Sequence, residues 1–475
     1  MNRPDCESPA SESPTCENAV CKNLCYGGSL NDISALADCL HDAGLDAEAA
    51  TVRAKLFAQA AEVLSADAER SAFFVPGRIE VLGKHTDYSG GWTVVVAAER
   101  GFSVVVAPRT DNCVSVTAVQ MGESTDFELD PDLLPAAGHW SNYPMTVARR
   151  IARNFPGISA GADIAFASDL PPAAGMSSSS AMMIGVFLSL AHVNRLAERD
   201  EYRSEIKSLT DLAGYLGTIE NGQNFGSLEG DRGVGTFGGS EDHTAIICGR
   251  PGQVSQYSYC PVRFERMVPI PAGYRFAVGV CGVVAEKTGE AKEKYNAASR
   301  RASALVELWN EKSGRHDPHL AAALAAVTNA GEKLATWADS SCREDFNARS
   351  LSSRLWQFVA ESEEIIPAAG DALARGDLKE FGRQVDRSQD LTDRWLGNQV
   401  PETVYLSARA REFGGAAASA FGAGFGGSVW ALVEAEKMDA FLARWQEDYR
   451  REYPQHDDLS SFFSTAAAPA TFQVC

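Results

Sequence analysis

The sequence has no long hydrophobic run and no excess of positive charge, and each absence excludes a class of protein. No stretch approaches the roughly 18 consecutive apolar residues of a membrane-spanning helix. The chain carries 43 Lys and Arg residues against 63 Asp and Glu residues, a net charge of −20 at pH 7. Nucleic-acid coating needs a positive surface that releases counterions, so we do not expect this chain to coat DNA or RNA. A nucleotide site is not excluded, because it needs only local dipoles and a few cations.

The N-terminus lacks the apolar core of a secretory signal peptide. Residues 1–25 are acidic and rich in Ser and Pro, so we expect a cytoplasmic protein whose cysteines are mostly reduced. Cys16, Cys21 and Cys25 lie close together, but no second Cys or His pair accompanies them, as a zinc site would require. We expect a loosely packed lead-in here, and a metal knuckle is the alternative.

What is present is an ordinary globular composition with mixed α and β patterning. The 475 residues are 45% hydrophobic and 22% charged, which suffices for a buried core in two or three domains. Short apolar runs predict strands at 73–75, 94–96, 103–106, 114–116, 162–166, 244–248, 254–259 and 274–282. Helical periodicity marks residues 31–70, 178–196, 209–220, much of 289–400, and 436–450. We therefore expect an α+β protein in two lobes, with a boundary in the 260–290 region.

Three glycine-rich segments stand out, and the first runs from Pro76 to Gly91. It places Arg78, Lys84, His85 and Asp87 within ten residues and ends on a Gly pair. Such crowding of donors and acceptors beside glycine suits a polyhydroxylated ligand. The alternative is a hairpin whose charges are merely solvated.

The second segment, Leu170–Ala181, combines Gly175 with four consecutive serines, Ser177–Ser180, in front of an apolar helix. Free backbone N–H groups, hydroxyls and the positive end of a helix dipole would form a phosphate cradle without a lysine. Helix capping is the alternative, although one Ser would suffice for that. The segment is not a Walker motif, which requires Gly-Lys-Ser/Thr.

The third segment is the glycine-rich turn Phe421–Ser428, which is weak evidence alone. In this order, the three segments resemble the GHMP kinase superfamily and, within it, the galactokinase family. The first is similar to the signature Gly-Arg-x-x-x-x-Gly-Glu-His-Thr-Asp-Tyr-x-Gly-Gly, and the resemblance covers roughly residues 70–470. It implies a two-lobed GHMP kinase fold, with a ribosomal S5 domain 2-like lobe at 71–270 and a ferredoxin-like lobe at 271–475. Residues 1–70 would form an N-terminal extension.

The resemblance also implies an enzyme, an ATP-dependent sugar 1-kinase, with galactose as the favoured sugar. Asp242 would face the anomeric hydroxyl, and Arg78 would lie between this carboxylate and the transferred phosphoryl group. Both would be catalytic. The sugar-binding residues implied by the resemblance are Lys84, His85, Asp87, Gly239 and Tyr295.

For the nucleotide, the resemblance assigns the ATP phosphates to Gly175, Ser177, Ser178, Ser179 and Ser180. A Mg²⁺ cofactor would be held by Glu220 and by the hydroxyl of Ser178 or Ser179. Glu229 is a rival for Glu220, because the family spaces this Glu about a dozen residues before the catalytic Asp. We favour Glu220, which ends a helix and is followed by Asn.

Lys84 departs from the family pattern, which has Glu at this position. A cation there could bind a carboxylate on the far carbon of the sugar, so a hexuronic acid is the alternative substrate. Lys84 could instead be solvated or pair with Glu80. A non-catalytic sugar sensor is a further alternative, and the His-Thr-Asp-Tyr sequence argues against a decarboxylase of the same superfamily. ATP and a monosaccharide are the expected partners, without nucleic acid or membrane, for a monomer or weak homo-oligomer.

Overall fold

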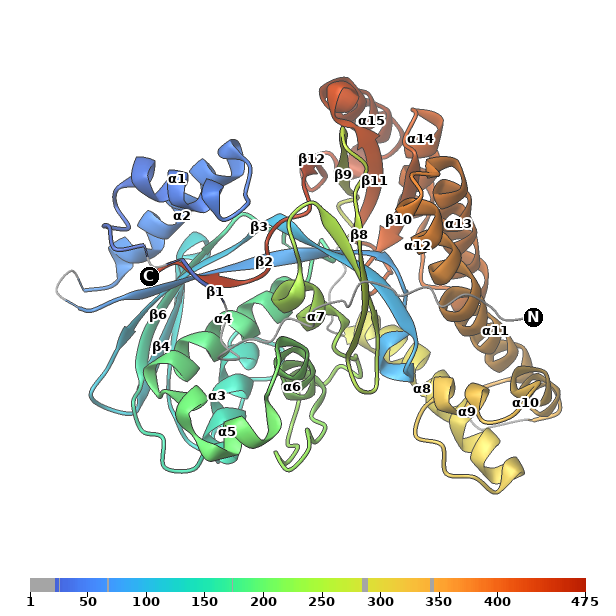
Figure 1. The fold of residues 1–475 in the computed structure, drawn as a ribbon, viewed down its shortest axis with the longest axis horizontal. Coiled ribbons are helices and arrows are strands. Elements are labelled where there is room, and N and C mark those ends of the chain that lie inside the picture. The colour runs from blue at the N-terminus through green and yellow to red at the C-terminus, as the bar shows by residue number, and fades with distance from the viewer. Residues whose placement is uncertain (1–21, 25, 66–67, 173, 284–288, 342–345) are drawn as a thin grey trace, which may run out of the picture.

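The protein folds into two lobes, each built on its own β-sheet (Figure 1). A computed structural model describes residues 22–24, 26–65, 68–172, 174–283, 289–341 and 346–475. Cys16, Cys21 and Cys25, for which a lead-in or a metal knuckle was expected, lie outside these residues. Within them, no helix has the length and hydropathy to cross a membrane.

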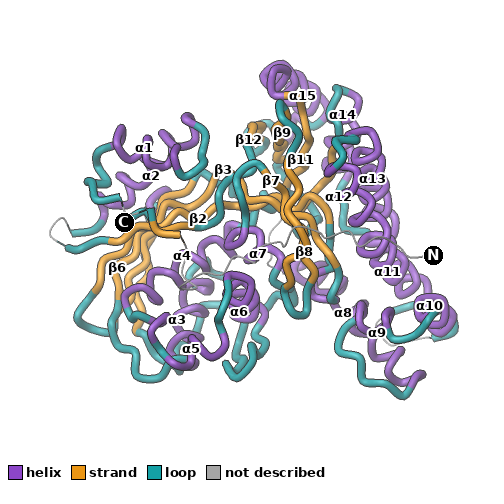
Figure 2. The backbone as a smooth tube through the Cα atoms, in the orientation of Figure 1, coloured by secondary structure: helices purple, strands orange, loops and turns teal. Residues whose placement is uncertain are grey.

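The first lobe is built on a sheet of nine strands in the order β1-β13-β2-β3-β6-β4-β5, with β7 on β3 and β8 on β7. Its two long central strands, β2 and β3, pair in antiparallel fashion. The strands are β1 (Lys22–Asn23), β2 (Ser71–Leu82), β3 (Trp92–Pro108), β4 (Cys113–Ala118), β5 (Glu123–Glu128), β6 (Ala162–Ser168), β7 (Gln253–Ser258), β8 (Arg263–Pro269) and β13 (Phe472–Gln473). Figure 2 shows the long strands β2 and β3 running from one side of this lobe into the middle of the molecule.

Helices cover both faces of the central strands, because side chains in a strand alternate between faces. Phe74 and Val105 pack with α1 and α2, whereas their neighbours Phe73 and Val104 pack into the main core, which contains Ile184 of α4. The helices of this lobe are α1 (Ile33–Asp42), α2 (Ala47–Val63), α3 (Asn142–Asn154), α4 (Ser178–Val193), α5 (Asp200–Glu205), α6 (Leu209–Asn221) and α7 (Glu241–Cys248).

The strand expected at 244–248 is wrong, because these residues belong to helix α7. A short apolar run such as Ala245-Ile246-Ile247 reads alike in a buried strand and in a buried helix. The first turn of α7 holds Glu241 and Asp242, a placement that the helix dipole favours.

The second lobe is a four-stranded sheet in the order β10-β11-β9-β12, with helices packed around it. Its strands are β9 (Tyr274–Val280), β10 (Ala417–Phe421), β11 (Ser428–Glu434) and β12 (Ser461–Thr465). Its helices are α8 (Gly289–Ser313), α9 (Leu320–Ala325), α10 (Ala330–Asp339), α11 (Ala348–Val359), α12 (Ile366–Ala374), α13 (Leu378–Leu391), α14 (Pro401–Glu412) and α15 (Met438–Glu452). The expected α+β, two-lobed architecture is confirmed.

The chain passes from the first lobe to the second between Pro269 and Tyr274, next to the boundary expected at 270/271. It later returns, because β13 pairs with β2 through Phe472 and Phe74. The second lobe is therefore inserted between two strands of the first sheet.

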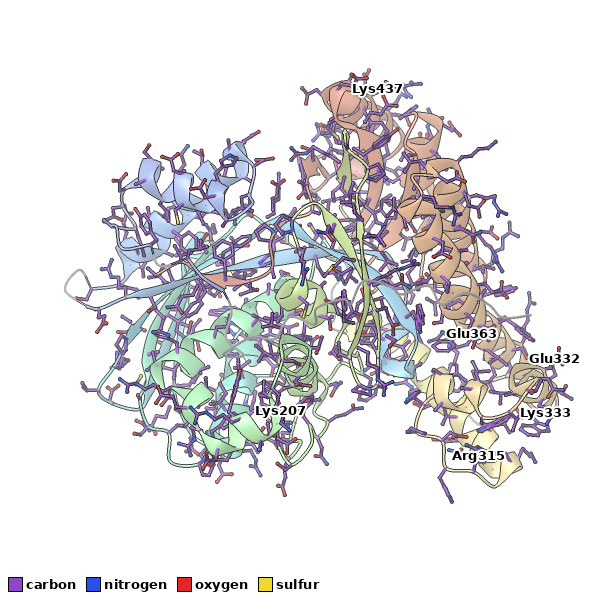
Figure 3. The ribbon with its side chains drawn as sticks, in the orientation of Figure 1. Lys207, Arg315, Glu332, Lys333, Glu363 and Lys437 are labelled. Carbon is purple, nitrogen blue, oxygen red and sulfur yellow. The ribbon has the colours of Figure 1, made fainter. Side chains whose placement is uncertain are left out.

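Charged side chains are divided between the surface and one buried cluster. Exposed ones such as Lys207, Lys333 and Lys437 project from the outside of the molecule (Figure 3). Others are buried between the lobes, among them Arg78, Glu80, Lys84, Asp87 and Glu241. Since burying a charge is costly unless it is paired or used, this cluster marks the place to look for a site.

Candidate active site

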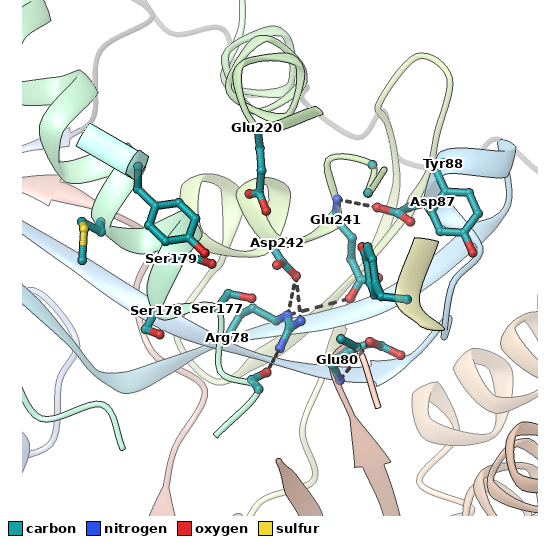
Figure 4. Close-up of a pocket in the computed structure, with 18 of the residues that line it drawn as sticks. Arg78, Glu80, Asp87, Tyr88, Ser177, Ser178, Ser179, Glu220, Glu241 and Asp242 are labelled. Atoms are coloured by element: carbon teal, nitrogen blue, oxygen red, sulfur yellow. Dashed lines mark hydrogen bonds and ion pairs between the residues drawn. The ribbon is translucent and has the colours of Figure 1, made fainter. Parts of the chain in front are cut away.

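A pocket of about 400 Å³ lies between the lobes, and all three glycine-rich segments contribute to its wall (Figure 4). The first lobe supplies most of the lining, and Tyr295 of α8, Gly422 and Ala423 come from the second. The remaining lining residues are Arg78, Glu80, His85, Asp87, Tyr88, Gly138, Trp140, Tyr143, Gly175, Ser177, Ser178, Ser179, Met182, Glu220, Gly238, Gly239, Glu241 and Asp242.

An ion pair between Arg78 and Asp242 occupies the middle of the pocket. The Nε atom of Arg78 donates to Asp242 Oδ1 over 2.8 Å, and a second guanidinium nitrogen lies 2.7 Å from the same oxygen. Arg78 is 4% exposed, and its guanidinium also donates to the carbonyl of Gly175. Burial acts to lower the pKa of Arg78, but Asp242 and Glu241 outweigh it and hold this pKa above its usual value. The guanidinium therefore stays charged beside the serine loop.

The serine loop is held in an unusual backbone conformation at the start of α4. Ser177 has φ of +58°, and its buried hydroxyl oxygen has no hydrogen-bond partner among the described residues. The third glycine-rich segment supports the loop, because Ser428 donates to the carbonyl of Ala174 over 2.6 Å. A Cβ atom on Gly422 would come within 2.8 Å of the Gly175 carbonyl oxygen, so only glycine allows this approach. The helix start thus presents unused backbone donors and a free hydroxyl, as an anion site requires.

The hydroxyl group that meets Glu220 belongs to Ser180, not to Ser178 or Ser179. Ser180 Oγ donates to Glu220 Oε2 over 2.9 Å and lies 3.3 Å from Asp242 Oδ2. Glu220 lines the pocket, whereas its rival Glu229 is an exposed residue outside it. In the described part of the chain, no three His, Cys, Asp or Glu side chains form a ready-made metal cluster.

The loop 83–88 carries His85 and Asp87 into the pocket. Asp87 Oδ2 accepts a hydrogen bond from the Glu241 backbone N–H over 3.1 Å. A Cβ atom on Gly239 would come within 2.4 Å of that same Asp87 oxygen, so glycine at 239 makes room for this carboxylate. His85 packs against Tyr295 with ring centroids 5.1 Å apart. The predicted sugar residues His85, Asp87, Gly239 and Tyr295 therefore come together at one end of the pocket.

The second lobe fixes the backbone of the same loop. Gln357 of α11 donates to the Lys84 carbonyl over 3.2 Å, and Arg354 of the same helix donates to the His85 carbonyl over 2.5 Å. Glu361, in the π-helical turn Ala360–Ile365, accepts from the Gly83 N–H over 2.8 Å. Loop 83–88 of the first lobe is thus tied to the second lobe.

The expectation that Lys84 contacts the sugar needs correction. Lys84 is 1% exposed, is not among the lining side chains, and its Nζ donates to Ser419 Oγ of β10 over 2.8 Å. It also lies near enough to Glu80 to oppose the rise in the pKa of that carboxyl. Gly83, at φ of +114°, turns the chain just before Lys84 and directs this side chain into the interface between the lobes.

Sequence reasoning missed two carboxylates in the pocket, Glu80 and Glu241. Glu80 lies two residues after Arg78 in β2, so both side chains project from the same face of the strand. That spacing was a signal available in the sequence. No sequence signal marked Glu241. Residues 244–248 were predicted as a strand, so the start of helix α7, which carries Glu241, was not expected.

Trp140, Tyr143 and Met182 were missed as well. Met182 is four residues after Ser178 on α4 and therefore shares its side of the helix. Trp140 and Tyr143, at the start of α3, carry no local motif.

Burial raises the pKa values of three carboxyls in the pocket, Glu80, Asp87 and Glu241. It raises the pKa of Glu80 to about 7, against the opposing effect of Lys84 and Arg78. It raises the pKa of Asp87 to about 6, and that of Glu241 well above its usual value. Glu80 contributes to the rise at Glu241, because like charges in one pocket disfavour ionising together.

Comparisons with known families match the same three segments. Residues 62–108 match the galactokinase galactose-binding signature, 142–226 the GHMP kinase N-terminal domain, and 371–451 the GHMP kinase C-terminal domain. Asp242 lies outside these ranges.

Related proteins span most of the chain. A galactokinase from Glaesserella parasuis serovar 5 is 26% identical over 81% of this chain and 91% of its own length. One from Chloroflexus aggregans is 28% identical over 78% of this chain and 85% of its own. The structure of Lactococcus lactis galactokinase complexed with galactose superposes with a TM-score of 0.71 and 22% identity, over 88% of this chain and 99% of that one.

Proposed function

Because this chain belongs to the galactokinase family of the GHMP kinase superfamily, we propose that it phosphorylates the anomeric hydroxyl of a monosaccharide, with galactose as the favoured substrate. MgATP and sugar would give sugar 1-phosphate and ADP. The observation that carries the proposal is the buried ion pair of Arg78 and Asp242, placed between the serine loop and the sugar-binding end.

Asp242 accepts or orients the proton of the attacking hydroxyl. As the bond from the sugar oxygen to the γ-phosphorus forms, the bond to the leaving ADP oxygen breaks, and the proton passes toward Asp242 Oδ2. Arg78 holds the other oxygen, Oδ1, and so fixes the orientation of the Asp242 carboxylate. Its guanidinium also offsets the negative charge on the transferred phosphoryl group.

The serine loop binds the phosphates of ATP. The first N–H groups of α4 and the Ser177 hydroxyl would donate to the β- and γ-phosphates. Glu220, Asp242 and the hydroxyls of Ser178 and Ser179 line the pocket and suit Mg²⁺, which prefers a few carboxylate or hydroxyl ligands together with substrate phosphates. Ser180, which lies behind them, positions the Glu220 carboxylate. When bound there, Mg²⁺ would neutralise phosphate charge.

Trp140 and Tyr143 bind the adenine end of the nucleotide. They line the pocket beside the serine loop, together with Met182. Aromatic faces and a thioether offer the flat, apolar surface on which a purine stacks.

The hexuronic-acid alternative loses its basis, because Lys84 does not line the pocket. The sensor alternative is disfavoured because Arg78, Asp242 and the serine loop form a complete set.

The test is ADP release with MgATP and a panel of galactose, arabinose, glucuronate and galacturonate. We expect the highest kcat/KM with galactose and a sugar 1-phosphate product, identified by phosphorus NMR. ADP release without a sugar phosphate, or phosphorylation at another hydroxyl, would contradict the proposal.

A further inference from the structure

Two buried carboxylates at the sugar end have no partner assigned by the reaction. Glu80 is 3% exposed and Glu241 is 6% exposed, and both line the pocket. Neither is needed for the proton or for the phosphates. Buried charged groups without a use are costly, so their presence in a pocket calls for a ligand.

Each carboxylate has one buried oxygen without a hydrogen bond. Glu80 Oε2 accepts from the Gly422 N–H over 3.2 Å, but Glu80 Oε1 is buried and has no hydrogen-bond partner in the described part of the chain. Glu241 Oε1 is likewise buried without a hydrogen bond, and its nearest cation is Arg78 at 3.9 Å. Buried acceptors are nearly always satisfied, so these two oxygens await donors.

Above about pH 7, where Glu80 and Asp87 ionise, the surrounding charge is negative. Among the lining side chains, Glu80, Asp87, Glu220, Glu241 and Asp242 face the single guanidinium of Arg78. Two further buried cations lie near these residues but do not line the pocket: Lys84 donates to Ser419, and Arg354 donates to the His85 carbonyl. An anionic sugar would add a further negative charge, whereas the hydroxyls of a neutral sugar are hydrogen-bond donors.

We propose that Glu80 and Glu241 are specificity residues that accept hydrogen bonds from sugar hydroxyls and make the pocket select neutral hexoses against hexuronic acids. This inference rests on the proposed function, since it names the substrate class of the same site. The inference is opposite to the one drawn from Lys84 in the sequence, which suggested a hexuronic acid as the substrate.

The test compares galactose with galacturonate in the wild type and in Glu80→Gln, Glu241→Gln and the double variant. It is run at about pH 8, above the pKa of about 7 at Glu80 and of about 6 at Asp87. Glutamine keeps the shape and removes the charge, and Glu332→Gln, at an exposed position, is the matched control. Sugar KM and kcat come from ADP release, and sugar Kd comes from calorimetry without ATP.

We expect wild-type kcat/KM to favour galactose over galacturonate by at least about 100-fold. Each single variant should raise the KM and Kd of galactose about tenfold, as loss of a hydrogen bond to a charged group does. The preference for galactose should narrow further in the double variant, and the KM of MgATP should stay within about twofold of wild type.

Equal use of the two sugars by the wild type, or unchanged galactose Kd in all three variants, would overturn the inference. A lower kcat at unchanged sugar KM would also overturn the inference. That result would mean that Glu80 acts by positioning Arg78 and not by binding the sugar. If galactose binds with the expected variant pattern but no ADP forms, the proposed reaction fails and the specificity assignment stands. If galactose does not bind, both fail.

Discussion

The two ends of the pocket are built in opposite ways. The phosphate end is a continuous piece of chain, Ser177–Ser180, that offers backbone N–H groups and hydroxyls. The sugar end gathers acceptors from separate elements: Glu80 from β2, Asp87 from the following loop and Glu241 from α7. Phosphates bring negative charge and need donors, whereas a sugar brings hydroxyl donors and needs acceptors. Each end therefore complements its own part of the reaction.

The Arg78–Asp242 pair joins the two ends, so its loss should have the largest effect. We expect Asp242→Asn to lower kcat by about 10³-fold, within the usual range for removing a general base. The Kd of ATP should change less than about threefold, because the serine loop is left intact. Single-turnover kinetics with calorimetry would check both values, and near-wild-type turnover would refute the mechanism.

Replacing Lys84 tests whether this side chain contacts the sugar. Lys84→Met leaves Glu80 without its neighbouring positive charge, so we expect the free energy of unfolding to fall by about 2 kcal/mol. The galactose KM should stay within about threefold, since this side chain does not line the pocket. Urea unfolding and ADP release measure the two effects, with Lys333→Met at an exposed position as the control. If Lys84→Met changed which sugar the enzyme prefers, Lys84 would have to contact the sugar after all.

Individual serines should differ within the phosphate end. Ser180→Ala removes the hydroxyl that contacts Glu220 and Asp242, so we expect the KM of MgATP to rise about tenfold. Ser179→Ala should change it less. The galactose Kd should stay the same in both variants, as calorimetry would show, and equal effects of the two substitutions would argue against the assignment of Ser180.

The smallest expected effect is a pH dependence of stability from the sugar end. The Glu80 carboxyl has a pKa of about 7 when folded, against an ordinary value of 4.5, so the folded state binds more protons between these values. Stability of the ligand-free protein should therefore fall as pH rises through this interval. In Glu80→Gln the fall should be smaller by about 1 kcal/mol, measured by urea unfolding at about pH 6 and 8. Parallel profiles for wild type and variant would contradict the raised pKa.

The same contrast explains what the sequence could predict. The serine loop and Arg78 were recognisable because each lies in a short, continuous motif. Glu241 and Trp140 enter the site only through packing of α7 and α3 against the sheet, which no local pattern reports. The direction of the Lys84 side chain could not be predicted for another reason. Strand β2 ends at Leu82 and Gly83 turns the chain, so the alternation of side chains along a strand no longer applies at Lys84.

The return of β13 to the first sheet has a consequence for synthesis of the chain. Domains generally fold as they emerge, N-terminal part first. Here β13 lies between β1 and β2, so the first-made lobe keeps an open sheet edge until residues 472 and 473 have been translated. All four strands of the inserted lobe are made before then. The last-made strand thus completes the first-made lobe, and a stalled ribosome would hold a nascent chain with an unpaired edge open to aggregation.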